Sequence, residues 1–277
     1  MDAENLMDSR EELERRALLE AIYERFHYDF RQYSVASVRR RLAQASRALG
    51  VSSLPALRER VTDDPSAFTT LLSYLTVQVS DLFRDPSFFR AFRAHIVPIL
   101  RTYPSLKIWV AGCSTGEEVY SFAILLREEG LLERSILYAT DINPEALRVA
   151  EAGIYPLDRM RAFTQNHQAS GAPCSLATYY TAKYGAAVFE RSLRKNVVFA
   201  DHSLATDAVF AETQVVSCRN VLIYFERALQ ERAISLFRDS LCTRGLLGLG
   251  SKESLRFSEQ EASFEVFMRE ERWYQRR

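Results

Sequence analysis

The sequence predicts an α/β protein that consists of a small helical domain and a larger domain built on a Rossmann-like, mostly parallel sheet. Three observations support this fold class. The apolar residues of the first hundred positions follow helical spacing, strand and helix patterns alternate from residue 106 onward, and the first strand runs into a glycine-bearing turn. We therefore place the helical domain at residues 11–101 and the sheet domain at residues 102–277.

The helical domain is predicted to begin with an amphipathic helix. Leu18, Ile22 and Phe26 recur every four residues and define one apolar face. Ser34 is a candidate N-cap for the next helix, and Gly50 is its expected end. No strand pattern interrupts this region, and further helices are expected at residues 34–49, from 53 to the break at 63–65, at 67–75 and at 86–100.

The sheet domain shows the alternation that is typical of a parallel sheet covered on both faces. Strands are expected at residues 106–111, 136–140, 197–200, 214–218 and 246–249, and helices at 117–129, 144–151 and 226–240. A closing antiparallel hairpin is expected at residues 264–268 and 271–274. Short strands at 179–181 and 187–189 predict a small β insert at about residues 175–196, and the polar residues 165–173 predict a loop.

Composition and charge argue against several classes of protein. The 36 basic residues balance the 36 acidic ones, so the global field favours neither nucleic acid nor an anionic membrane. The four cysteines are scattered without a CxxC pair, which argues against a disulfide framework and a zinc site. No apolar run approaches the ~20 residues of a membrane span, and residues 1–12 are acidic and polar, unlike a signal peptide. We therefore expect a cytoplasmic protein rather than a membrane protein.

The most informative segment is the turn after the first predicted strand. This turn carries Gly112 and Gly116 and leads into a helix, and the next strand ends in Asp141. Open α/β sheets hold adenosine-containing cofactors in this way, with the acid accepting the ribose hydroxyls. The turn matches neither the pyrophosphate motif GxGxxG nor the P-loop. Because Glu117 and Glu118 stand where a phosphate would need neutral or basic groups, a cationic cofactor without phosphates, such as S-adenosylmethionine, fits best.

The sheet domain carries four motifs in order, at 111–118 (AGCSTGEE), 139–142 (ATDI), 218–225 (CRNVLIYF) and 250–255 (GSKESL). The helical part adds 28–30 (YDF), 39–42 (RRRL) and 82–85 (LFRD). Together these motifs resemble the CheR family of chemotaxis receptor methyltransferases, over roughly residues 18–274. The combination of motifs in this order is highly specific.

The resemblance implies a helical domain followed by an S-adenosylmethionine-dependent methyltransferase domain. That domain would have a mostly parallel sheet, an antiparallel final strand and a small inserted β-subdomain. The implied activity is methyl transfer from S-adenosylmethionine to glutamate side chains of chemoreceptor-type signalling helices. The products are glutamate methyl esters and S-adenosylhomocysteine, and no metal is expected.

The resemblance also implies a set of site residues. Glu117 would bind the amino group of the cofactor and Asp141 its ribose, while Arg84 and Tyr224 would lie beside the reactive methyl group as catalytic residues. A glutamate carboxylate is already ionised at neutral pH, so the enzyme would need to position it and would need no general base. The implied cofactor-binding set is Gln78, Ser80, Arg84, Gly112, Glu117, Asp141, Ile142, Ser203, Leu204, Cys218, Arg219 and Asn220.

Departures from the family pattern keep a second function open. Gln78 stands where the family commonly has asparagine, Ser80 where it often has threonine, and Ser203 where it usually has asparagine. These changes are compatible with a catalytically weak module that binds the cofactor and regulates a chemosensory array. A methyltransferase for nucleic acid or a small molecule is disfavoured, because the chain has no net positive charge and no basic-aromatic stacking surface.

The expected partner is a methyl-accepting, chemoreceptor-type coiled coil. Arg39, Arg40 and Arg41 either form a solvated helix face or dock the acidic faces of such helices. Residues 179–189 lack the glycine-rich turn of relatives that hold a receptor's C-terminal peptide, so we expect no dependence on that tether. We also expect a monomer.

Overall fold

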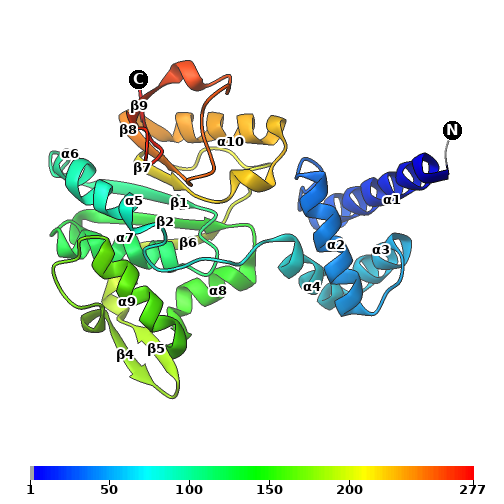
Figure 1. Cartoon of the computed structure of the whole chain (residues 1–277), viewed down its shortest axis with the longest axis horizontal. Helices are drawn as coiled ribbons and strands as arrows, with labels where there is room; N and C mark the ends of the chain where they lie inside the picture. The colour runs from blue at the N-terminus through cyan, green and yellow to red at the C-terminus, as the bar shows by residue number, and fades with distance from the viewer. Residues whose placement is uncertain (1–2) are drawn as a thin grey trace. The chain divides into compact units, whose positions relative to one another are not determined.

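The computed structural model describes residues 3–277, which form two compact units (Figure 1). Residues 1–2, part of the acidic N-terminal segment considered above, lie outside the described residues. The first unit contains the chain up to Val77 together with Ser203–Asp207 and Tyr224–Ala233. The second unit contains Gln78–His202, Ala208–Ile223 and Ile234–Arg277. By its contacts, residues 78–101 therefore belong with the sheet, whereas the sequence placed the domain boundary after residue 101.

The first unit is helical, as predicted. Leu18 and Ile22 are completely buried, and the rings of Phe26 and Phe68 stack with their centroids 3.8 Å apart. Gly50 ends the second helix in the left-handed conformation, at φ +68°. The helices are α1 (Ala3–Phe26), α2 (Val35–Leu49), α3 (Leu54–Asp63) and α4 (Pro65–Leu75).

Two short segments from later in the chain complete this unit. Phe225 forms an antiparallel bridge with Tyr33, and their rings meet edge to face at a centroid distance of 4.8 Å. The carbonyl of Tyr224 accepts a hydrogen bond from the N–H of Ser34 at 2.8 Å. The backbone around Tyr224 is therefore fixed to the linker that precedes α2.

The second unit is built on a seven-stranded sheet in the order β6-β2-β1-β7-β8-β10-β9. Strands β6, β2, β1, β7 and β8 run parallel, and β10 lies antiparallel between β8 and β9, which confirms the predicted mostly parallel sheet with an antiparallel end. The strands are β1 (Leu106–Ala111), β2 (Ser135–Asp141), β6 (Val197–Asp201), β7 (Thr213–Cys218), β8 (Leu241–Leu249), β9 (Phe264–Met268) and β10 (Trp273–Arg276).

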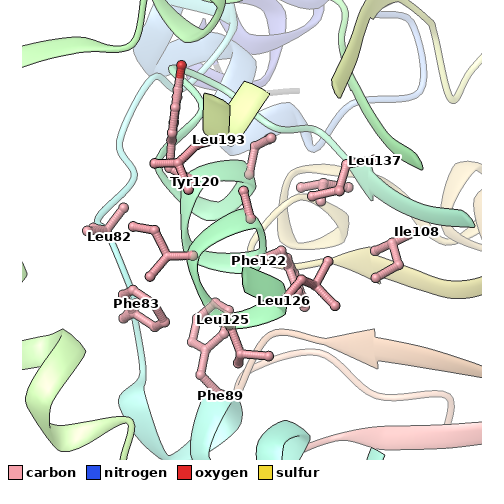
Figure 2. Close-up of a cluster of buried hydrophobic side chains, with 14 of the residues drawn as sticks. Leu82, Phe83, Phe89, Ile108, Tyr120, Phe122, Leu125, Leu126, Leu137 and Leu193 are labelled. Atoms are coloured by element: carbon pink, nitrogen blue, oxygen red, sulfur yellow. The ribbon is translucent and has the colours of Figure 1, made fainter. Parts of the chain in front are cut away.

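Helix α7 lies at the centre of the core of this unit (Figure 2). Phe122 of α7 meets Phe89 edge to face, with centroids 5.3 Å apart, and Phe89 meets Phe83 at 5.1 Å. This packing explains why the helical segment before β1 belongs with the sheet. The helices are α5 (Pro86–Ala91), a π-helical turn (Phe92–Ile96), α6 (Val97–Leu100), α7 (Glu117–Glu128), α8 (Pro144–Ala152), α9 (Met160–Ala169) and α10 (Arg227–Ser240), which begins in the first unit.

A small antiparallel sheet is inserted between α8 and β6, in the order β3-β5-β4. Its strands are β3 (Ile154–Pro156), β4 (Tyr180–Lys183) and β5 (Ala186–Phe189). Tyr184 and Gly185 join β4 to β5 and both have positive φ, at 49° and 75°, as a two-residue type I′ turn requires. The sequence predicted β4 and β5 but missed β3, which is only three residues long and ends in proline.

Helix α9 was not predicted. Its residues 165–169 were expected as loop. Phe163 and His167 are completely buried, four residues apart on one helix face, while the polar residues between them carry little apolar signal. Burial of this narrow face, rather than the composition of the segment, stabilises the helix.

Among the described residues, no helix combines the length and the apolar content that crossing a bilayer requires.

The core of the second unit also contains a buried ionic cluster around Glu128, whose side chain is 1% exposed. Its carboxylate lies 2.7 Å from Nη2 of Arg93 and 2.9 Å from Nε2 of His167. Burial raises the pKa of Glu128, but the hydrogen bonds from His167 and Arg93 outweigh this effect and hold the pKa below its ordinary value of 4.5. The cluster ties α7 to α9 and to the π-helical turn.

Replacing Glu128 by glutamine should lower the free energy of unfolding by about 2–4 kcal/mol near neutral pH, because it removes one partner of a buried ion pair. A lowered carboxyl pKa in the folded state stabilises the protein above the unfolded pKa, and this contribution is lost as the pH falls through the folded value. The free energies of unfolding of the unmodified protein and of Glu128→Gln, measured in urea, should therefore differ less at about pH 4 than at about pH 7. Glu190→Gln, at the half-exposed pair with Arg127, is the control and should cost less than about 1 kcal/mol.

Candidate functional site

The order of the strands locates the candidate site. From the central strand β1, the chain continues to β2 and β6 on one side, and later to β7 and β8 on the other. Such a change of direction leaves a crevice outside the carboxyl ends of the two central strands, where open α/β sheets bind ligands. Seven of the twelve predicted cofactor-binding residues lie at the carboxyl ends of β1, β2 and β7 or in the segments that directly follow these strands.

The turn after β1 needs both of its glycines. Gly112 has φ +69°, and a Cβ atom there would lie 2.5 Å from Cγ2 of Val221, in the turn after β7. Gly116 has φ +91°, and a Cβ atom there would lie 2.6 Å from Cβ of Ala150 on α8. Each glycine therefore combines a left-handed backbone with a close approach that a side chain would prevent.

Asp141 ends β2 and joins that strand to the turn after β1. Its side chain is nearly buried, and its two oxygens accept hydrogen bonds from the N–H of Ser114 at 2.8 Å and of Asn143 at 2.9 Å. Burial raises the pKa of Asp141, while the backbone N–H groups of Asn143, Ser114 and Ile142 lower it. Because a carboxylate has about four acceptor positions, Asp141 can still accept hydroxyl groups of a ligand. Gln78 joins the same turn, since its Oε1 accepts the hydroxyl of Ser114 at 2.7 Å.

Glu117, the first residue of α7, is completely buried. Its Oε1 accepts a hydrogen bond from Nη1 of Arg159 at 2.6 Å, and its Oε2 accepts the hydroxyl of Thr115 at 2.7 Å. Nη2 of Arg159 donates to Asp81 at 2.9 Å and to the carbonyl of Ser80. Ser80 therefore contributes its backbone to this group of residues. Arg159 was not predicted, because nothing in its local sequence marks it.

Arg84 lies in a loop that is held in an uncommon backbone conformation. Its neighbours Phe83 and Asp85 both have positive φ, at 51° and 56°. The side chain of Arg219, only 2% exposed, donates to the carbonyl of Arg84 at 2.9 Å, to Asp85 at 2.7 Å and to Glu118 at 2.9 Å. Non-glycine residues keep such conformations where the surroundings enforce them, often at functional sites. The side chain of Arg219 therefore supports the Arg84 loop, and its contact with the cofactor stays a prediction.

The turn after β7 is held by Glu253, a residue that the sequence analysis did not single out. Its carboxylate accepts N–H groups of Asn220 at 2.9 Å, Val221 at 2.9 Å and Gly250 at 2.7 Å. Asn220 has φ +60°, and its Oδ1 is buried without a hydrogen-bond partner among the described residues. Cys218, before this turn, is completely buried, and burial raises the pKa of its thiol. Its position as the acid of the 250–255 motif is the feature of the sequence that could have identified Glu253.

The remaining predicted residues are placed as follows. Ile142 is half-buried directly after Asp141. Ser203, Leu204 and Tyr224 belong to the first unit, where the N–H of Ser203 donates to Asp207 at 2.9 Å and Leu204 is buried.

Of the three predicted docking arginines on α2, Arg40 is the exposed one. Arg39 is half-buried and lies 3.3 Å from Glu11, and Arg41 is half-buried as well. The cluster therefore presents less positive charge to solvent than its sequence suggests.

The groups that meet in the second unit fit S-adenosylmethionine. The ribose donates two hydroxyl groups and the amino-acid end carries an ammonium group, so both need acceptors. Asp141 and Glu117 are buried carboxylates at the ends of adjacent elements, and Asn220 offers a buried amide oxygen with no partner in the described chain. A buried polar atom without a partner is unusual in a folded protein and is consistent with a ligand at this position.

Gly112→Ala should lower the free energy of unfolding by about 2–4 kcal/mol, because the new methyl group would both strain the backbone and overlap Val221. Gly130→Ala is a matched control: its φ is +71°, but no atom lies within 4 Å of the added Cβ, so only the strain of about 1–2 kcal/mol should remain. Urea unfolding measures both. Equal losses in the two variants would show that the contact with Val221 is unimportant.

Comparison with known proteins now identifies the family. Residues 78–271 match the model of the CheR methyltransferase, SAM binding domain, and residues 13–76 match that of the CheR methyltransferase, all-alpha domain. The chain is 57% identical to the putative methyltransferase Cher3 of Pseudomonas putida, over 96% of this chain and 97% of that protein. It is 29% identical to a chemotaxis protein methyltransferase of Klebsiella aerogenes, over 86% of this chain and 82% of that protein. With both of its parts matched, this chain belongs to the CheR methyltransferase family.

Proposed function

We propose that this protein transfers a methyl group from S-adenosylmethionine to glutamate carboxylates of chemoreceptor-type signalling helices, forming methyl esters and S-adenosylhomocysteine. The observation that carries the proposal is the pair of buried carboxylates, Asp141 and Glu117, at the edge of the sheet where ligands bind. Membership of a family of S-adenosylmethionine-dependent methyltransferases supports the reaction class. The choice of glutamate as acceptor rests on Arg84.

In this proposal the second unit binds the cofactor. Asp141 accepts the ribose hydroxyls, Glu117 accepts the ammonium group, and the free amide oxygen of Asn220 accepts a further donor. Gln78, held by Ser114, and Ser80, held by Arg159, border the same region. Bound there, the sulfonium supplies a methyl group that a carboxylate oxygen can take up without first losing a proton.

Arg84 holds the acceptor glutamate in this proposal, because a guanidinium binds a carboxylate through two parallel hydrogen bonds. The loop around Arg84 is fixed before the acceptor arrives, by Arg219 and by the hydrogen bond from the N–H of Phe83 to Ser121 at 2.7 Å. Preorganisation of this kind lowers the entropic part of a reaction barrier. Tyr224 is proposed as the second group beside the methyl.

The proposed partner is a methyl-accepting receptor coiled coil in the cytoplasm, met by a monomer of this protein. Arg40, exposed on α2, would dock the acidic faces of such helices. The two-residue turn between β4 and β5 leaves no glycine-rich loop, which supports independence from a receptor's C-terminal tether.

Calorimetry with S-adenosylhomocysteine tests the cofactor site. The unmodified protein should bind it, and Asp141→Asn should bind it about 10–100-fold more weakly, because a neutral amide replaces the carboxylate that accepts the ribose hydroxyls. Asp158→Asn, which changes the charge of an exposed residue, should leave the affinity unchanged. An Asp141→Asn protein that is folded and binds as tightly as the parent would refute the assignment.

Arg84→Ala should lower the rate of methyl-ester formation on receptor fragments by at least about a hundredfold, while S-adenosylhomocysteine affinity changes by less than about threefold. The assay follows base-labile methyl groups after incubation with labelled S-adenosylmethionine. Arg90→Ala, at an exposed arginine on α5, should retain full activity. Binding of the cofactor without any ester in the unmodified protein would favour the regulatory-module alternative that Gln78 and Ser203 raise.

A further inference from the structure

Arg159 is a charged residue at the candidate site to which the proposed function gives no ligand-binding role. It ends the short helical turn Leu157–Arg159, between strand β3 of the inserted sheet and helix α9. Its guanidinium reaches out of the insert to the buried carboxylate of Glu117, with Nη1 2.6 Å from Oε1. The turn that follows β3 thus contributes a cation to a site whose other residues come from the main sheet with helix α7 and from the segment before α5.

Contacts within the protein fix the guanidinium of Arg159, but not all of its N–H groups donate hydrogen bonds to these partners. Its hydrogen bonds to Glu117, Asp81 and the carbonyl of Ser80 use three of its five N–H groups. Its carbon atom Cζ lies 4.6 Å from the centroid of the Phe163 ring, which fixes the orientation of the group through a cation–π contact. The side chain remains 32% exposed, so a ligand can reach it.

The pairing of charges matches one chemical group. Glu117 and Arg159 place an anion and a cation side by side, and the amino-acid end of the proposed cofactor carries an ammonium and a carboxylate on one carbon atom. Glu117 can bind the ammonium but repels the carboxylate, and Arg84 is assigned to the acceptor. We propose that Arg159 binds the carboxylate of the cofactor's amino-acid end while Glu117 binds its ammonium group. This inference rests on the proposed function.

The ion pair between Arg159 and Asp81 is the contact that the carboxylate of a ligand can replace. Asp81 is the more exposed partner of Arg159, with half of its side chain in solvent, so water screens this ion pair far more than the pair with the fully buried Glu117. A ligand carboxylate can therefore replace Asp81 on the guanidinium while Glu117 stays bound. Asp81→Asn should consequently bind S-adenosylhomocysteine at least as tightly as the parent.

Three ligands test the inference by calorimetry: S-adenosylhomocysteine, its decarboxylated analogue, which keeps the ammonium, and methylthioadenosine, which lacks the amino-acid end. The unmodified protein should prefer S-adenosylhomocysteine to the decarboxylated analogue by at least about tenfold. Arg159→Met should weaken binding of S-adenosylhomocysteine about 10–100-fold and leave the affinity for the other two ligands within about threefold. Arg159→Lys should restore part of the loss, and Arg161→Met, at an exposed arginine two residues away, should change nothing.

The outcomes separate the possible roles of Arg159. An equal loss for all three ligands in Arg159→Met would overturn the inference, because a residue that only supports the fold would act on every ligand. Tighter binding of S-adenosylhomocysteine would overturn it as well, since Arg159 would then compete for Glu117. If Arg159→Met fails to fold, the ligand preference of the unmodified protein and of Arg159→Lys decides. An unmodified protein that binds none of the ligands would instead contradict the proposed function itself.

Discussion

The carboxylate of Asp141 is the interaction on which the geometry of the candidate site depends. By accepting one N–H from the turn after β1 and one from the loop after β2, it fixes the ends of two neighbouring strands to each other. Glu253 does the same for the turn after β7 and the segment after β8. Burial raises the pKa of both acids, and the backbone N–H groups offset part of this effect. The loops of the site are therefore held by side chains rather than by regular secondary structure.

Arginines complete this arrangement by pairing with the acids that the site needs. Arg219 neutralises Glu118 and Asp85 and holds the loop of Arg84, and Arg159 neutralises Glu117. Such pairing offsets part of the free-energy cost of burying the charge of these acids. Each of the two acids at the start of α7, Glu117 and Glu118, is therefore paired with an arginine.

The sequence predicted the elements that depend on residues close together in the chain. It did not predict the features that depend on contacts between distant residues. Strand β1, its glycine turn and helix α7 were predicted within one residue, because apolar periodicity and glycine placement are local signals. Helix α9 was missed, and part of it was predicted as loop, because its stability comes from burying Phe163 and His167 against other elements. Arg159 lies outside any motif, and the hydrogen bond of the Arg219 side chain to the Arg84 loop joins residues that are distant in the sequence. Contacts of this kind cannot be read from spacing alone.

The contact between Gly112 and Val221 has a consequence for how this protein can change. The two residues lie in separate motifs, yet no side chain fits between them. The effect of a substitution in one motif on stability therefore depends on the residue in the other motif. The effects of substitutions in the two motifs should consequently not be additive. A library that randomises either motif alone would recover only variants compatible with the existing partner, and altered specificity at this edge of the sheet would be reached by changing both motifs together.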